Sequence, residues 1–312
     1  MRPIASRREF LASAAGAAVA ATARATAAEP GTATSRWRPN YILSSALYGG
    51  APLAEILPEV KKTGCGSLDI WPKPHGGQRE EVDALGIDRV RALLVEHGVR
   101  LGSMTCYRPG AFLLPGEFDV ATRLGGERVV LVTMALGNGE ATGDALDAEI
   151  RGFFEKLAPS IAAAEKADGS IAIENHANSL LRTPESIRRF VSMIPSDRVG
   201  IALAPHHLPQ DGALLASLAR DIGPKLRFVY AQQLGNGSTI KLPKDEELLQ
   251  MPGRGPLDFG PLMRELATLR FAGPLEIFMH PVPRGVPILD TTAAVTAEVN
   301  RARAYLDGLL PA

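Results

Sequence analysis

Residues 170–176 read Ser-Ile-Ala-Ile-Glu-Asn-His, and they show the unit from which the fold is built. A short run rich in β-branched residues predicts a strand, and the polar residues that follow it predict a turn. From Tyr41 onward the chain repeats this unit, with an amphipathic segment and then Gly or Pro before each new run. The eight runs begin near Tyr41, Gly66, Arg100, Arg128, Ser170, Val199, Leu226 and Pro274.

Amphipathic helices are predicted between the runs, most clearly over residues 87–97, 149–166 and 259–270. In the first of these, Asp88 suits the positive end of the helix dipole and Gly98 can end the helix. Strands that alternate with helices in a chain of this length predict an α/β fold, a single-domain (β/α)₈ TIM barrel. A doubly wound open sheet is the alternative, but no glycine-rich phosphate loop follows the first run.

The first 27 residues predict a twin-arginine signal peptide. An Arg-Arg pair at positions 7 and 8 precedes a weakly apolar stretch, and residues 25–27 have the small-x-small pattern of a cleavage site. This stretch is too weakly apolar to span a bilayer, so we expect export to the periplasm or medium without stable membrane insertion. Residues 28–40 are polar and aperiodic and are predicted to be a linker, which leaves residues 41–312 for the barrel.

The composition excludes several classes of protein. The 312 residues include 34 basic and 34 acidic side chains, 46% hydrophobic residues and two cysteines. This apolar content excludes a disordered chain, and two cysteines exclude a disulfide framework. The neutral balance argues against a nucleic-acid partner, because such proteins need a basic excess to neutralise phosphates. The oligomeric state stays open, a homo-oligomer included.

Five of the six histidines follow predicted strands. His75 follows the second strand, His176 the fifth, His206 and His207 the sixth, and His280 the eighth. The carboxyl ends of the strands form one rim of a TIM barrel, so these side chains are predicted to meet there. Imidazoles at such a rim can bind a metal ion or act as acids and bases near neutral pH.

Two segments carry a family resemblance. Residues 171–176, Ile-Ala-Ile-Glu-Asn-His, followed by Thr-Pro-Glu at 183–185, resemble the fifth-strand region of the xylose isomerase-like TIM-barrel superfamily of sugar isomerases and epimerases. Residues 251–259, Met-Pro-Gly-Arg-Gly-Pro-Leu-Asp-Phe, are similar to the stretch of that superfamily between strands 7 and 8. The resemblance extends over most of the chain from Tyr41 onward and implies a small carbohydrate as substrate.

The resemblance also implies a divalent metal held by a strand 5 carboxylate, a strand 6 Asp, a strand 7 His and a strand 8 Glu. Only the first of these four ligands is retained, as Glu174. The other positions hold Ala204 for the Asp, Tyr230 or Gln232 for the His, and Phe278 for the Glu. A single carboxylate does not hold a divalent ion, which needs about four to six donors.

Two hypotheses for the site follow. In the first, the metal site is rebuilt from Glu174, His207, Gln232 and His280, a mixed nitrogen and oxygen set that suits Mn, Zn, Co or Fe. In the second, the metal is lost and the histidines serve as acids, bases and hydrogen-bond donors. In either case the candidate catalytic residues are Glu174, His207 and His176.

Further residues are predicted to bind the substrate. Trp71 ends the second strand, where an aromatic ring can stack on the apolar face of a sugar, and His75 follows it. His206 lies at the same rim, Glu276 in the eighth strand, and Arg284 in the proline-rich loop after that strand.

The leading functional hypothesis is an exported sugar isomerase or epimerase. Glu174 or a rim histidine would remove a proton from the carbon next to a carbonyl, with a metal or an imidazolium stabilising the resulting charge. A keto-sugar lyase or hydratase is an alternative that begins with the same step. A barrel that binds sugars and has lost catalysis with the family ligands is another, whereas cleavage of abasic DNA is disfavoured by the neutral charge.

Overall fold

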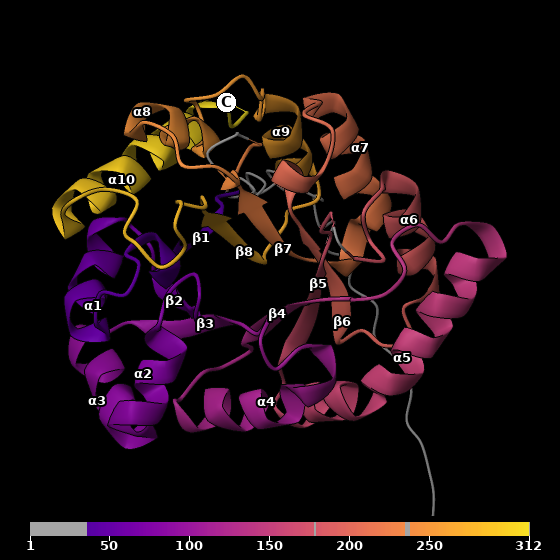
Figure 1. Ribbon diagram of the computed structural model, residues 1–312, viewed down its shortest axis with the longest axis horizontal. Helices are drawn as coiled ribbons and strands as arrows, with labels where there is room; N and C mark the ends of the chain where they lie inside the picture. The colour runs from indigo at the N-terminus through magenta and orange to yellow at the C-terminus, as the bar shows by residue number, and fades with distance from the viewer. Residues whose placement is uncertain (1–35, 178, 235–237, 312) are drawn as a thin grey trace, which may run out of the picture. The chain divides into compact units, whose positions relative to one another are not determined.

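A closed barrel of eight parallel strands forms the centre of the molecule. The computed structural model describes residues 36–177, 179–234 and 238–311. The strands pair in chain order, and β1 pairs with both β2 and β8, which closes the sheet. Figure 1 shows the strands inside a ring of helices, so the predicted (β/α)₈ barrel is confirmed. The predicted signal peptide and most of the predicted linker lie outside the described residues.

Every strand begins within two residues of its predicted position. The strands are β1 Asn40–Ser44, β2 Ser67–Ile70, β3 Arg100–Thr105, β4 Val130–Met134, β5 Ser170–Glu174, β6 Val199–Leu203, β7 Leu226–Ala231 and β8 Pro274–Ile277. They are short and nearly all buried, since helices cover one face and the barrel interior covers the other. Trp37 precedes β1 and donates its indole N–H to the carbonyl of Phe271 at 2.7 Å, so the barrel unit starts there.

The helices form the outer layer. They are α1 Leu53–Lys62, α2 Gln78–Leu85, α3 Ile87–His97, α4 Leu114–Arg123, α5 Gly143–Lys166, α6 Pro184–Met193, α7 Gly212–Ile222, α8 Lys244–Glu247, α9 Gly260–Thr268 and α10 Thr292–Gly308. The bounds of α3 are those predicted, and Gly98 ends it with a left-handed φ of 58°. Helix α5 begins six residues before the predicted position, because Leu146 extends its buried stripe. No helix in the described ranges is long and apolar enough to cross a membrane.

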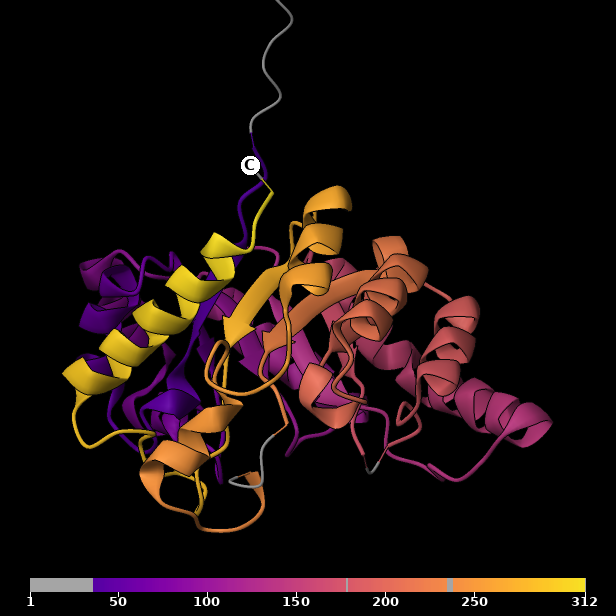
Figure 2. The same cartoon turned by 90° about the horizontal axis from the view of Figure 1, so that it is seen from above.

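Helix α10 completes the outer layer beside the first helices (Figure 2). The side-chain amide of Asn300 in α10 donates to the carbonyl of Lys62 at 3.0 Å. Thr296 of the same helix donates to the Glu59 carboxylate of α1 at 2.7 Å and also bonds the Tyr48 hydroxyl at 2.9 Å. These contacts hold the last helix on the first one, more than 230 residues apart in sequence.

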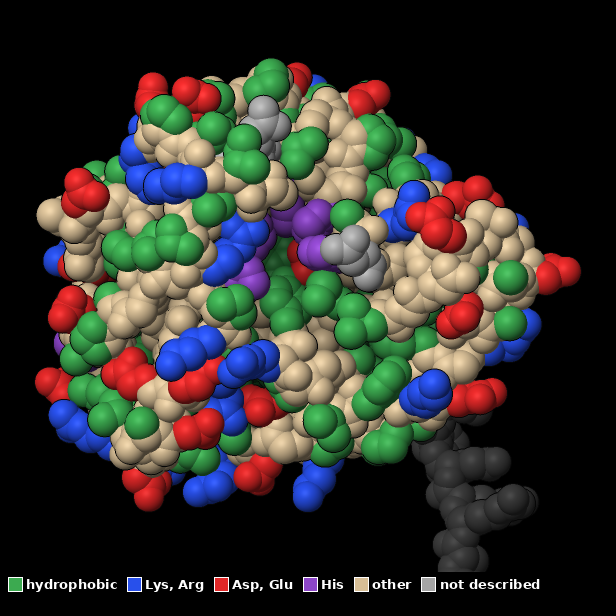
Figure 3. All heavy atoms as spheres, in the orientation of Figure 1, with side chains coloured by type: hydrophobic (Ala, Val, Ile, Leu, Met, Phe, Trp, Pro, Cys, Tyr) green, Lys and Arg blue, Asp and Glu red, His purple; other side chains and the backbone are tan. Residues whose placement is uncertain are grey.

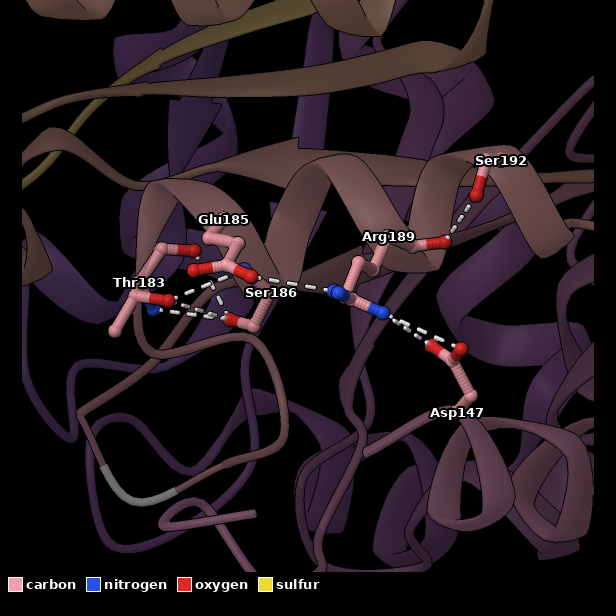
Figure 4. Close-up of polar contacts among 6 residues, drawn as sticks. All are labelled: Asp147, Thr183, Glu185, Ser186, Arg189 and Ser192. Carbon is pink, nitrogen blue, oxygen red and sulfur yellow. Dashed lines mark hydrogen bonds and ion pairs between the residues drawn. The ribbon is translucent and has the colours of Figure 1, made fainter. Parts of the chain in front are cut away.

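Helix α6 follows the strand that ends in Glu174, and its start is fixed by a capping box (Figure 4). The Thr183 hydroxyl accepts a hydrogen bond from the Ser186 amide at 3.1 Å, and the Ser186 hydroxyl accepts from the Thr183 amide at 3.0 Å. Further along the helix, the Arg189 guanidinium contacts the Asp147 carboxylate of α5 at 3.1 Å. This reciprocal cap satisfies amides at the helix start, and the ion pair ties α6 to its neighbour.

Candidate active site at the barrel mouth

Glu174 lies at the centre of the mouth. It is the last residue of β5, between β4 and β6, and its side chain is only 3% exposed. The Tyr107 hydroxyl, two residues beyond β3, donates a short hydrogen bond to Glu174 Oε2. The Tyr230 hydroxyl of β7 lies 3.3 Å from that of Tyr107. His207 Nε2 lies 3.8 Å from the other carboxylate oxygen, Oε1.

No Lys or Arg forms an ion pair with Glu174 among the described residues. Burial raises the pKa of Glu174 to about 8, and the hydrogen bond from Tyr107 opposes this only in part. A buried carboxylate without a cation is costly to ionise, because its charge has left water without compensation. Glu174 therefore lies where a bound cation would be stabilised.

Five histidines gather at this end of the barrel, as the positions of the predicted strands indicated, and two of them, His206 and His207, lie beside Glu174. The ring centroids of His176 and His207 are 4.0 Å apart, and those of His206 and His207 are also 4.0 Å apart. The ring centroids of His206 and His280 are 5.7 Å apart, and those of His280 and His75 are 5.0 Å apart. Figure 3 shows histidine side chains gathered at a hollow in this face of the molecule. The strand ends thus bring imidazoles from four different loops together.

These imidazoles are electrically neutral near pH 7. Burial lowers the pKa of His75 to about 4 and that of His207 to about 3. Burial also lowers the pKa of His206 and His280 well below the usual value, with further lowering by neighbouring histidines and by Arg284. A neutral imidazole can donate through one nitrogen and accept or bind a metal through the other. An imidazolium, which the metal-free hypothesis would use, is disfavoured at these positions.

The donor atoms fit a divalent metal. Ligand atoms of Glu174, His206 and His207 all lie within 4.8 Å of one another. Both ring nitrogens of His206 and the Nε2 atom of His207 are buried and make no hydrogen bond. A carboxylate oxygen with two neutral imidazole nitrogens is a ligand set that Zn, Mn, Fe and Co accept. His206, predicted to bind substrate, thus joins Glu174 and His207 of the predicted metal set.

The other two predicted ligands lie nearby. Gln232 is fully buried, and its amide nitrogen donates to Gln250 Oε1 at 2.8 Å while its own Oε1 has no hydrogen-bond partner. His280 Nδ1 is also buried without a partner, but its ring lies beside His206 and His75. His280 is not part of the compact group around Glu174.

Residues at the family's other ligand positions have packing roles. Asn175 exchanges two hydrogen bonds with the backbone of Ala204, at 2.8 and 2.9 Å. The Phe278 ring stacks on Trp71 with the ring centroids 4.5 Å apart. Tyr230 turns its hydroxyl to Tyr107. Ala204 and Phe278 therefore offer no side-chain donor to a metal, and the Tyr230 hydroxyl is engaged with Tyr107.

Trp71 and Glu276, both predicted to bind substrate, lie beneath the mouth with no exposed surface. The Trp71 indole N–H donates to Glu276 Oε1 at 3.1 Å. The neighbouring Asp69 carboxylate accepts from the Thr105 hydroxyl at 2.9 Å. Burial raises the pKa of Asp69 and of Glu276. The nearby Asp69 carboxyl raises the pKa of Glu276 further, whereas the interaction with Glu276 lowers the pKa of Asp69 in part. These side chains support the floor of the site and do not line its open surface.

Tyr107 and Asp69 are site residues that the sequence reasoning missed. Tyr107 comes two residues after β3, and the same strand-end position identified the histidines. Asp69 is a charged residue in a buried strand, which is uncommon unless the charge has a partner or a function. Both signals were present in the sequence, but neither residue belongs to a recognised motif.

Several solved structures share the fold of this chain at low sequence identity. The IOLI protein, solved with a bound zinc atom, shares 15% identity at a TM-score of 0.67, with 88% of this chain and 99% of that one covered. L-ribulose 3-epimerase shares 16% identity at a TM-score of 0.61, with 88% of this chain and 95% of that one covered. For 3-keto-D-glucoside 4-epimerase (YcjR) from E. coli the identity is 15% and the TM-score is 0.61, with 86% of this chain and 100% of that one covered.

No curated protein matches the chain in sequence. The family comparison is decisive, however, because residues 57–298 match the family described as xylose isomerase-like TIM barrel. That match includes β2 to β8 and every residue of the histidine cluster. The chain therefore belongs to the xylose isomerase-like TIM barrel family.

Proposed function

We propose that this barrel is a carbohydrate isomerase or epimerase that removes a proton from the carbon next to a carbonyl. The observation that carries the proposal is Glu174, a buried carboxylate at the mouth that faces neutral imidazoles and contacts no cation. Two of the similar structures are epimerases that act on sugars, which supports a carbohydrate as substrate.

Glu174 is the proposed base. Burial makes its ionised form a stronger base than an ordinary carboxylate. Tyr107 donates a hydrogen bond to Oε2, and Oε1 lies 3.8 Å from His207 Nε2. The imidazoles of His176 and His207 lie within reach of the same space, 4.0 Å from each other. They can donate hydrogen bonds to a substrate hydroxyl, while the proton that Glu174 has taken up is returned by Glu174 to the second carbon, as isomerisation requires.

A divalent ion fits the group formed by Glu174, His206 and His207. When bound, it would supply Lewis-acid polarisation of the carbonyl. The chain itself contributes the positions of these ligands, which come from the ends of β5 and β6, and the burial that keeps the imidazoles neutral for binding.

Deuterium exchange tests the proposal without knowledge of the product. In heavy water with a panel of aldoses, ketoses and 3-keto-sugars, the protein should exchange the proton next to the carbonyl of at least one sugar. Glu174→Gln should slow this exchange about a hundredfold or more, the usual scale for loss of a general base. Glu155→Gln, an exposed position on α5, removes the same charge away from the site and should leave the rate unchanged.

The product separates the competing reactions. An epimer or an isomer supports the proposal, whereas an unsaturated product would indicate the lyase alternative. Binding of sugars without exchange in any of them would indicate a sugar-binding barrel that lacks catalysis.

We also propose export through the twin-arginine pathway, on the basis of Arg7 and Arg8 and the cleavage pattern at residues 25–27. Changing both arginines to Lys keeps the charge but should retain the precursor inside the cell. Normal amounts of the Lys-Lys protein outside the cell would contradict this assignment.

A further inference from the structure

We propose that Arg284 binds a carboxylate on the substrate, so that the preferred substrates are acidic sugars such as uronates. This inference rests on the proposed function, since it names the class of carbohydrate that the same mouth would accept.

Arg284 lies on a loop that is anchored at several points. The carbonyl of Gly285 accepts a hydrogen bond from the Gly50 amide at 3.1 Å, and the Ile288 amide donates to the carbonyl of Leu47 at 3.0 Å. Gly285 has a φ of 80°, and a Cβ atom there would lie 2.8 Å from the Pro74 carbonyl oxygen, so glycine is required. The loop therefore presents Arg284 from a fixed backbone.

The guanidinium is held in place but has no carboxylate partner. Arg284 Nη1 donates to the carbonyl of Pro281 at 2.8 Å, and Nη2 donates to the carbonyl of Ser238 at 2.7 Å. No ion pair found among the described residues includes Arg284, whereas Arg254 and Arg301 both pair with Glu298. Two carbonyls occupy two of its five N–H groups, which leaves three planar N–H donors, on Nε and on each Nη, for a carboxylate.

Arg284 lies beside the histidine cluster. It follows His280 in the same loop, and its neighbour Gly285 packs against Pro74, the residue before His75. Figure 3 shows Lys or Arg side chains next to the histidines at the hollow. Within the described part of the chain, Glu174 is the one carboxylate grouped with His206 and His207, and Tyr107 already contacts it. A ligand with one negative charge would complement this half-buried cation.

A carboxylate fits this position better than a phosphate. Arg284 supplies one positive charge and a planar set of donors, which match a planar monoanion. A phosphate dianion would call for a second cation beside the guanidinium. Neutral sugars would leave the guanidinium without its counter-charge.

Pairs of sugars that differ only at C6 test the inference. D-glucose with D-glucuronate, and D-galactose with D-galacturonate, should be compared in the deuterium-exchange assay at low salt. The kcat/KM for the better uronate should exceed that of its neutral partner at least tenfold and should fall as salt rises. Arg284→Gln should bring this ratio towards one, and Arg284→Lys should restore part of it. Arg91→Gln, which removes an exposed guanidinium from α3, should leave the ratio as in the wild type.

Calorimetric binding to the Glu174→Gln protein separates failure of this inference from failure of the proposed function. Tighter binding of the uronate that is lost in the Glu174→Gln, Arg284→Gln double variant supports the inference even if no sugar exchanges. Exchange of sugars with equal uronate-to-neutral ratios in wild type and Arg284→Gln would overturn the inference and leave the proposed function standing. Preference for D-glucose 6-phosphate over D-glucuronate would also overturn it.

Discussion

At the scale of single residues, the metal ligands can be distinguished by substitution. His206 belongs to the compact group with Glu174 and His207, whereas the predicted ligand His280 lies on the far side of His206. His206→Ala should therefore weaken binding of Zn²⁺ or Mn²⁺ by more than tenfold, because it removes a direct ligand. Even mutation of a residue that only hydrogen-bonds to a ligand typically lowers metal affinity ten- to a hundredfold. His280→Ala should change the affinity by less than threefold. Isothermal titration of each metal into the purified variants measures both values.

Far-ultraviolet circular dichroism of the two variants controls for folding. Glu174→Gln should abolish tight binding altogether, because it removes the charged ligand of the group. Equal affinities in the His206→Ala and His280→Ala proteins would show that the ion is not held by the three residues named here.

The sequence predicts the residues of the mouth better than it predicts their roles. The strand-end rule placed all five histidines and Glu174 at one rim, because that rule depends only on chain topology. Roles depend on side-chain direction, which the sequence does not carry. Trp71 and Glu276 point beneath the mouth and bond each other, and the strand pattern alone could not show this.

At the scale of elements, the capping box of α6 gives a direct prediction. Thr183→Ala removes the acceptor for the Ser186 amide, and loss of such an N-cap typically lowers the free energy of unfolding by about 1 kcal/mol. Thr183→Ser keeps the hydroxyl and should retain most of this stability. Urea unfolding followed by circular dichroism measures the difference, and equal midpoints for the Ala and Ser variants would contradict the role of the cap.

Element bounds were predictable where a residue marks the end of a helix. Gly98 adopts the left-handed conformation that was expected of it and stops α3 at His97. The start of α5 has no such mark, since Thr142 makes no side-chain cap and the prediction began at the first strong apolar stripe. Buried contacts then extend the helix to Gly143.

At the scale of the whole molecule, three strands meet where the barrel closes. Glu276 of β8 and Asp69 of β2 flank β1, which pairs with both strands. One oxygen of each carboxyl and the Ser44 hydroxyl of β1 are buried and make no hydrogen bond, although the two carboxyls lie close enough to affect each other's pKa. No sequence pattern predicts that Glu276 and Asp69 lie near each other, because the two residues are 207 positions apart along the chain. The order of the strands was predictable, whereas this contact arises only when the barrel has closed.

This carboxyl pair should make stability fall as the pH rises. Burial raises the pKa of Asp69 to about 7, against about 4 in an unfolded chain, so between these values the folded protein binds more protons than the unfolded protein. The free energy of unfolding therefore decreases through this range. Asp69→Asn cannot ionise, and its amide can donate to Glu276, so the decrease from pH 5 to pH 8 should be smaller by about 1 kcal/mol or more.

Urea unfolding of wild type and Asp69→Asn at four values from pH 5 to pH 8 measures this difference. The buried histidines act in the opposite direction below about pH 6.5, since their lowered pKa values make the folded state bind fewer protons there. Subtraction of the two curves removes that contribution, because both proteins contain the same histidines. Asp119→Asn, at an exposed position on α4, should follow the wild-type curve. If Asp69→Asn follows it as well, Asp69 is ionised in the folded barrel throughout, and the hydrogen bonds that it accepts, such as that from Thr105, outweigh the effect of burial.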